Sequence, residues 1–239
     1  MASRGHSITF VSPFRIKETE NIKEIYLDGV SKLMEENIVD WFSMSKRSSF
    51  LQLTSLVYRV QDIFKKTYLS LAANIDLHSV IRARQVDTVV ADCFYNEMVF
   101  PMADHLGVPL ILHCSSASLK GLITTAGGYA DYASVPSADG DYHDNMNFVE
   151  RVINFLSTEI FKAATGHILV DMLDDLVKKD YPNSRSIKEI AKDVSLILFN
   201  SNPATTWVRS LPPSIIPIGN VHTRPSKPLL EVLLIKWLF

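Results

Sequence analysis

Asp92 and His113 are the residues of this chain best placed for chemistry. Asp92 follows the β-prone run at residues 86–91, which holds one acid, and His113 follows the apolar run at residues 108–112. Both runs are typical of strands buried in a parallel sheet. Open α/β sheets bind ligands beyond the carboxyl ends of such strands, so Asp92 is a candidate site residue by position. The imidazole of His113 could face the same crevice.

An ordinary structural role competes with this interpretation. An aspartate directly after a strand is often a turn or helix-cap residue, because its side chain accepts from the free amides that follow. The residue type alone favours that role over a catalytic one. The seven histidines are scattered singly, and a lone histidine is more typical of a surface or core position than of a catalytic base.

The two apolar runs belong to a predicted βαβ unit. Between them, residues 96–106 carry apolar side chains at three- and four-residue steps, which predicts a helix with one buried side. Gly107 should end that helix, and the second strand follows at once. A unit of this size predicts a right-handed crossover between parallel strands.

Strands and helices alternate along the rest of the chain, which predicts the α/β class. Further strands are expected at residues 7–11, 22–27, 195–199 and 215–219, and helices at residues 29–42, 48–71, 76–84, 147–161, 168–177 and 186–191. The apolar positions of the helix at 147–161 are Phe148, Val152, Phe155, Leu156 and Ile160, and ordinary packing is their favoured role. We predict a long loop at residues 121–140, and the tyrosines in this loop suggest that it binds a ligand.

Composition limits the function classes. The 239 residues include 47% hydrophobic residues, enough for a full-sized core. Lys and Arg number 24 against 26 Asp and Glu, so no basic surplus favours nucleic acid. No GxGxxG, P-loop or GxSxG motif occurs. We expect one domain that ends in a linker and does not bind nucleic acid.

The two cysteines and the chain ends carry further expectations. Cys93 and Cys114 follow the two strands of the βαβ unit; a disulfide is possible there, but two buried free thiols are the favoured prediction. The sequence contains no CxxC or HxxxH pair, so no metal site is predicted. The first six residues lack the apolar core of a signal peptide. The apolar run at 229–239 has eleven residues, against about 20 for a membrane-spanning helix.

Several motifs together resemble the UDP-glycosyltransferase family, in particular its animal UDP-glucuronosyltransferase-like branch. The matches occur in family order along most of the chain: RGHSITFVSP at 4–13, VDTVVAD at 86–92, LGVP at 106–109, MNFVERV at 146–152, ILFNS at 197–201, IPIGNVH at 216–222 and KPL at 227–229. No single motif is decisive, and the ordered set is specific.

The resemblance implies the amino-terminal half of a GT-B fold, a Rossmann-like parallel sheet with helices on both faces. Residues 1–224 would form the acceptor-binding domain without its first strand. Residues 225–239 would be an inter-domain linker with an atypical apolar tail, since Leu230 stands where the family has proline. The carboxy-terminal UDP-sugar-binding domain is expected to be absent.

The family transfers a glycosyl or glucuronosyl group from a UDP-sugar to a hydroxyl of a small lipophilic acceptor, which places it among the hexosyltransferases. Asp92 matches the family acid that orients a catalytic histidine. That histidine would lie upstream of Arg4, so this chain alone is expected to be inactive. By position we predict acceptor-binding roles for Phe94, His113, Ser115, Ser118 and Tyr129. The UDP-sugar is a co-substrate held by the other domain, and neither cofactor nor metal is expected.

The sequence is also compatible with other functions. The chain could be an inactive short form that regulates full-length enzymes through homo- or hetero-oligomers, a stand-alone lipophile-binding domain, or an incomplete stretch of a longer enzyme. The family resides in the endoplasmic reticulum membrane and faces the lumen. Without a signal peptide or an anchor in this sequence, the location of the chain itself stays unassigned.

Overall fold

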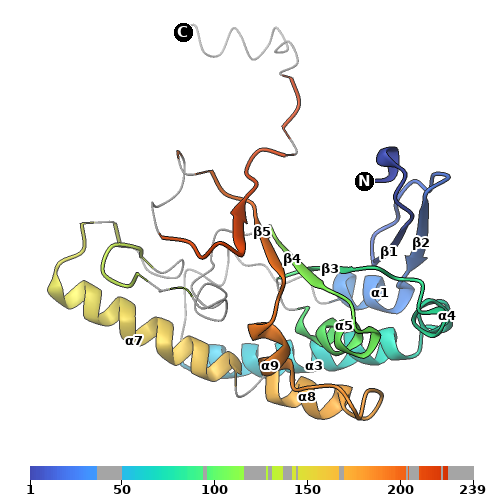
Figure 1. Cartoon of the computed structure of the whole chain (residues 1–239). Helices are drawn as coiled ribbons and strands as arrows, with labels where there is room; N and C mark the ends of the chain where they lie inside the picture. The colour runs from blue at the N-terminus through green and yellow to red at the C-terminus, as the bar shows by residue number, and fades with distance from the viewer. Residues whose placement is uncertain are drawn as a thin grey trace, which may run out of the picture.

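Two parallel β-sheets and the helices around them form the described part of the protein (Figure 1). The computed structural model describes residues 1–36, 50–93, 96–115, 128, 131–136, 142–143, 145–166, 170–202, 204, 210–221 and 223–225. The first sheet pairs β1 (Ile8–Ser12) with β2 (Ile22–Tyr26). The second has the order β3-β4-β5-β6, with strands Val89–Asp92, Leu110–Cys114, Leu196–Phe199 and Ile215–Pro217.

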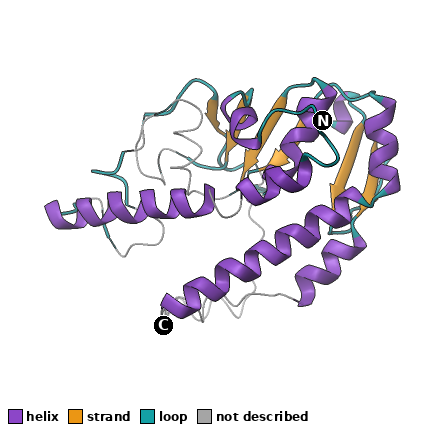
Figure 2. Ribbon diagram, turned by 90° about the horizontal axis from the view of Figure 1, so that it is seen from below, coloured by secondary structure: helices purple, strands orange, loops and turns teal. Residues whose placement is uncertain are grey.

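The helices lie close to the predicted positions. They are α1 (Asp28–Glu36), α3 (Phe50–Ala72), α4 (Ile75–Ala83), α5 (Phe100–Leu106), α7 (Phe148–Thr165), α8 (Asp171–Val177) and α9 (Ile187–Lys192), with short 3-10 helices η1 (Ala2–Arg4) and η2 (Glu97–Val99). Figure 2 shows the long helices alongside the strands. Parallel sheets flanked by helices confirm the α/β, Rossmann-like class.

The central unit is η2 and α5 between β3 and β4, as the βαβ pattern predicted. Its first strand is shorter than expected and begins at Val89, whose N–H donates to the carbonyl of Pro109 at 3.0 Å. At the other end of α5, Gly107 adopts a φ of 70°, and its N–H closes the last turn. The strand β4 can therefore begin three residues later, beside β3.

One face of the larger sheet forms the main core. Ala91, Leu112, Cys114, Ile197 and Phe199 point to this face and are all less than 9% exposed. They pack with buried side chains of α5, α8 and α9 and with Tyr68 of α3. Alternate residues face the other way, and Val90 on that side is 50% exposed. Positions on that second face can therefore meet a ligand.

The first two strands form a separate sheet in the described residues, although the sequence predicted one parallel sheet. A second core cluster of Ile25, Leu77 and Ile81 joins β2 to α4. Met102 and Leu106 of α5 pack against that cluster from the side of the larger sheet. The helices α4 and α5 thus connect the two sheets by apolar contacts.

Helix α7 turns its apolar side outward, which corrects the expectation that this side packs. Phe148 is 80% and Ile160 68% exposed, whereas Asn154 is 0% and Thr158 8% exposed. The buried Asn154 amide donates to the carbonyls of Tyr132 at 2.8 Å and Val135 at 3.0 Å. Because these carbonyls need a donor when buried, they draw the polar side of α7 inward. The helix extends away from the strands (Figures 1 and 2).

Parts of the predicted organisation stay predictions. The tail at residues 226–239 and most of the long loop at 121–140 lie outside the described residues. The division into a domain at 1–224 and a linker at 225–239 is therefore untested. None of the helices in the described part of the chain is long and apolar enough to cross a membrane.

Candidate functional site at the carboxyl ends of β3 and β4

The structure places Asp92 and His113 side by side. They are directly paired in the parallel register of β3 and β4. Oδ2 of Asp92 lies 3.7 Å from Nδ1 of His113. Their side chains are 39% and 42% exposed, respectively, so water or a ligand can reach both. The two candidates that the sequence could only place at strand ends therefore form one cluster.

Strand alternation explains why this pair faces away from the core. Ala91 and Leu112 precede the pair on their strands, and both side chains are buried in the main core. Successive side chains of a strand point to opposite faces. Asp92 and His113 consequently point to the open face, at the edge where parallel strands end.

Cys93 and Cys114 form a disulfide directly beside the pair, which corrects the preferred prediction of two free thiols. Each cysteine follows a member of the pair by one residue, and their Cα atoms are 5.0 Å apart, within the range a disulfide requires. The physical reason is the register. Because Asp92 lies opposite His113, the next residues on the core side also come together.

Backbone hydrogen bonds hold the same strand ends. The N–H of Cys93 donates to the carbonyl of His113 at 2.9 Å, and the N–H of Asn200 donates to the carbonyl of Cys114 at 2.9 Å. Rigid strand ends of this kind position side chains more precisely than a loop does.

The other sequence candidates are less well placed. Ser115 is exposed and directly follows β4, and its carbonyl accepts from Nδ2 of Asn200 at 3.5 Å. Phe94, Ser118 and Tyr129 lie outside the described residues. Tyr132, one of the tyrosines of the predicted loop at 121–140, donates its hydroxyl to Glu159 and packs edge-on against Phe155, with 5.1 Å between the ring centres. Its contacts are structural.

Glu97 is an acidic residue of the same βαβ unit that sequence reasoning missed. It opens η2, five residues after Asp92, and is half-buried. Burial raises the pKa of its carboxyl. The sequence pattern gave no signal for it, because η2 was read as the first turn of an ordinary helix.

Gly219 marks a close approach at the neighbouring strand ends. A Cβ at this position would lie 2.5 Å from the carbonyl oxygen of Ser201, so only glycine fits there without a shift. The N–H of Gly219 donates to that carbonyl at 2.9 Å. The chain after β6 is thereby held against the end of β5.

The described residues form no metal centre, and a small cavity lies among the helices. No group of three His, Cys, Asp or Glu side chains among them could hold a metal ion. A cavity between α3, α4 and the turn after α8 measures about 30 Å³ and is lined by residues such as Tyr68, His78 and Asp180. That volume suits a single water molecule.

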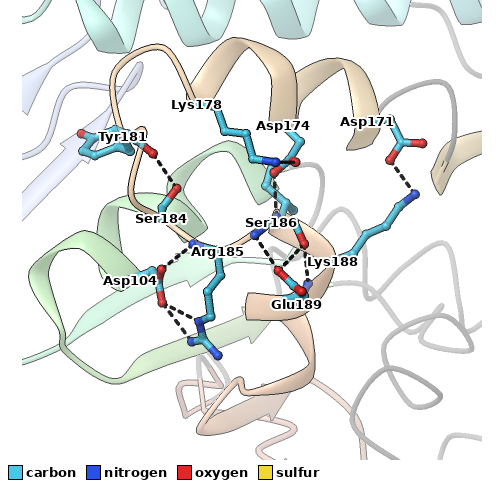
Figure 3. Close-up of polar contacts among 11 residues, drawn as sticks. Asp104, Asp171, Asp174, Lys178, Tyr181, Ser184, Arg185, Ser186, Lys188 and Glu189 are labelled. Atoms are coloured by element: carbon cyan, nitrogen blue, oxygen red, sulfur yellow. Dashed lines mark hydrogen bonds and ion pairs between the residues drawn. The ribbon is translucent and has the colours of Figure 1, made fainter.

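A second polar cluster lies between α5, α8 and α9 (Figure 3). Arg185 donates from its backbone N–H and from Nε to the two carboxylate oxygens of Asp104, each at 2.9 Å, and its guanidinium also contacts Asp193. Nearby, Glu189 and Ser186 form the capping box of α9. These charges satisfy one another and join the helices that lead into β4 and β5.

Fold and site together define a Rossmann-like domain with a carboxylate and an imidazole at the carboxyl ends of its parallel strands, the edge where open α/β sheets generally bind ligands. The chain belongs to the family described as "UDP-glucoronosyl and UDP-glucosyl transferase", whose model matches residues 1–234. The resemblance seen in the sequence motifs is thereby confirmed.

Several curated proteins are similar to the chain over nearly its whole length. UDP-glycosyltransferase UGT4 of Dactylopius coccus is 23% identical, covering 98% of this chain and 46% of that protein. UDP-glucuronosyltransferase 2C1 of Oryctolagus cuniculus is 27% identical over 96% of this chain and 49% of its own length. UDP-glucuronosyltransferase 3A1 of Xenopus laevis is 23% identical, covering 93% of this chain and 40% of that protein.

The chain thus spans somewhat less than half the length of these relatives. No solved structure matches it.

Proposed function

We propose that this chain is the acceptor-binding part of a UDP-glycosyltransferase. The reaction would transfer a glycosyl or glucuronosyl group from a UDP-sugar to a hydroxyl of a small lipophilic acceptor, with inversion at the anomeric carbon. The observation that carries the proposal is Asp92 at the carboxyl end of β3, within a chain that matches the family model over residues 1–234.

Asp92 would act on a histidine rather than on the sugar. A carboxylate that faces one nitrogen of an imidazole fixes its tautomer and stabilises the imidazolium that forms when the other nitrogen takes a proton. In this reaction the proton comes from the acceptor hydroxyl, and its removal makes the oxygen a better nucleophile. Asp92 is well placed for such a role, because it is only partly exposed and sits on a strand fixed by its neighbours.

For these 239 residues alone we propose acceptor binding without transfer. The relatives named above are about twice as long, and the UDP-sugar would be held by residues beyond the matched half. Weak affinity, with a Kd of roughly 10 μM to 1 mM, is the expectation for a lipophilic phenol that meets one wall of a two-domain cleft.

The experiment combines binding with product detection. Equilibrium dialysis of the full chain against 1-naphthol measures acceptor binding, and mass spectrometry after incubation with UDP-glucose or UDP-glucuronate detects transfer. We expect saturable binding and no glycoside. Product formed by the purified chain would overturn the inactive assignment, and an absence of binding up to millimolar naphthol would overturn the acceptor-binding function.

A second candidate function is that of a regulatory partner of longer family members. The exposed apolar side of α7 favours it, through Phe148, Val149, Val152, Ile153, Phe155, Leu156 and Ile160. Exposed apolar patches of this kind often mark interaction sites. Co-expression with a full-length relative tests this role. Co-purification that is lost with Phe148→Ser and Ile160→Ser would support it, and separate elution of the two proteins would refute it.

A further inference from the structure

We propose that Cys93 is a site of reversible modification by small thiols such as glutathione. The thiol opens the Cys93–Cys114 disulfide at the sulfur of Cys93 while the chain stays folded. This role goes beyond the proposed function and is independent of acceptor binding, because it concerns only the chemistry of the two sulfur atoms.

The two cysteines differ in exposure. Cys114 is 0% exposed and belongs to the main core, together with Leu112 and Phe199. Cys93 directly follows β3, is only partly buried, and packs against that core. The rate of thiol–disulfide exchange depends on access to the attacked sulfur. Cys93 is therefore the cysteine that a thiol from solution attacks.

The exchange has two steps. A glutathione thiolate forms a bond to Sγ of Cys93, and the bond between the two Sγ atoms breaks with its electron pair on Cys114, which takes up a proton. A second glutathione thiolate attacks the glutathione sulfur of this mixed disulfide and releases Cys93, which also takes up a proton. The chain gains two electrons and two protons, and two glutathione molecules become one molecule of oxidised glutathione.

Other contacts hold the strand ends when the disulfide is open. The N–H of Cys93 donates to the carbonyl of His113, and the N–H of Asn200 donates to the carbonyl of Cys114, both at 2.9 Å. These bonds do not need the link between the sulfur atoms. Loss of the disulfide costs about 3 kcal/mol, less than the roughly 5–15 kcal/mol by which native domains are stable. The reduced chain therefore stays folded.

The position of Cys114 makes the modification reversible. A buried cysteine thiol packs like a small apolar side chain, so the core accepts Cys114 in its reduced form. The Cα atoms of the two cysteines are 5.0 Å apart, within the range for a disulfide. Because the strands hold this spacing, Cys114 can displace glutathione from Cys93 and form the disulfide again. Cys93 thus carries the modification, and Cys114 removes it.

Two matched variants compare the two sulfur atoms. Cys114→Ala leaves Cys93 as a free thiol, and Cys93→Ala leaves Cys114. We expect oxidised glutathione to modify Cys93 at least about tenfold faster than Cys114 in the folded full chain, measured by intact mass spectrometry. Urea titration confirms that both variants are folded. Equal rates, or a faster reaction at Cys114, would overturn the assignment to Cys93.

The wild-type chain shows where the mixed disulfide forms. The full chain is incubated with reduced glutathione, and free thiols are then blocked with N-ethylmaleimide in denaturant. We expect peptide masses with glutathione on Cys93 and N-ethylmaleimide on Cys114, and oxidised glutathione should afterwards restore the disulfide. A disulfide that glutathione leaves intact, glutathione on Cys114, or a chain that stays reduced would each overturn the proposal.

The urea dependence of the reduction separates exchange in the folded chain from exchange after unfolding. Local opening exposes little surface, so the rate should change less than about twofold over the urea concentrations below the unfolding transition. A rate that rises with urea in parallel with global unfolding would show that the disulfide opens only in the unfolded chain, and the proposal would fail.

Discussion

The two ends of the larger sheet use charged residues in opposite ways. Near the amino ends of β4 and β5, Arg185 makes 2.9 Å contacts with Asp104, whose side chain is only 15% exposed. At the carboxyl ends, Asp92 and His113 stand 3.7 Å apart and remain about two-fifths exposed. Charges that are fully engaged by one another stabilise a fold. Asp92 and His113 are held by their strands and stay accessible to water or a ligand.

The difference follows from what each end must do. The helices α5 and α9 run into β4 and β5, and Arg185 ties their last turns together through Asp104 and Asp193. At the opposite end the chain leaves the sheet, and a disulfide rather than an ion pair holds the strand ends.

Loss of the disulfide should lower the free energy of unfolding more than the other changes proposed below. Cys93 and Cys114 are 21 residues apart in sequence, and closing a loop of that length stabilises a protein by about 3 kcal/mol. Reducing agent should lower the free energy of unfolding by that amount in urea titrations. The double variant Cys93→Ser/Cys114→Ser serves as the control, because reductant should not change it. If reductant did not change the urea midpoint of the wild-type chain, the Cys93–Cys114 disulfide would be contradicted.

Asn154→Ala should cause the next largest loss of stability. The variant removes the donor for two carbonyls, those of Tyr132 and Val135, at a position that is 0% exposed. We expect a loss of about 2 kcal/mol in unfolding free energy, measured by urea denaturation. The exposed Asn21 is the matched control, and Asn21→Ala should change stability by less than about 0.5 kcal/mol. Equal effects in both variants would argue against the inward polar face of α7.

Asp104→Ala tests the amino-end cluster directly. It leaves the backbone N–H and guanidinium of Arg185 without their main acceptor, and we expect a loss of about 1–2 kcal/mol in unfolding free energy. Asp62→Ala breaks an exposed ion pair with Lys66 and should cost less than about 0.5 kcal/mol. Asp104→Ala should leave the affinity for 1-naphthol unchanged in equilibrium dialysis. A fall in that affinity would mean that the two ends do not have separate roles.

The smallest effect should be a pH dependence in the same cluster. Hydrogen bonds from the backbone N–H and the hydroxyl of Ser186 lower the pKa of Glu189 from its usual 4.5. The ionised form is therefore favoured by folding, so its contribution is present above pH 4.5 and is lost as the pH falls through the lower folded value. Urea midpoints of wild type and Glu189→Gln should converge below pH 4. If the difference in urea midpoint between wild type and Glu189→Gln stayed constant from pH 3 to pH 7, the hydrogen bonds from Ser186 would not be the cause.

Much of the fold could be predicted from periodicity and turn residues. The apolar run at 108–112 and Gly107 correctly predicted β4 and the end of α5. The helix at 147–161 was also correctly predicted, but its orientation was not. The buried face of α7 depends on the Tyr132 and Val135 carbonyls, which lie 22 and 19 residues before Asn154 in sequence. Helical periodicity alone contains no information on such partners.

The candidate site was predictable only in part, for a similar reason. Sequence placed Asp92 and His113 at the ends of two strands, but their direct pairing depends on the register of β3 against β4. The same register decides between two free thiols and a disulfide at Cys93 and Cys114. Register depends on contacts between whole strands, and local residue types specify it only weakly.

Chemical-shift mapping compares ligand contact at both ends of the sheet in one experiment. The amide signals of ¹⁵N-labelled full chain are followed during titration with 1-naphthol. We expect saturable shifts at Asp92, Cys93 and His113, with those of Asp104 and Arg185 unchanged. Shifts centred on Asp104 and Arg185 would contradict it, as would a titration in which no signal at the carboxyl ends of β3 and β4 moves.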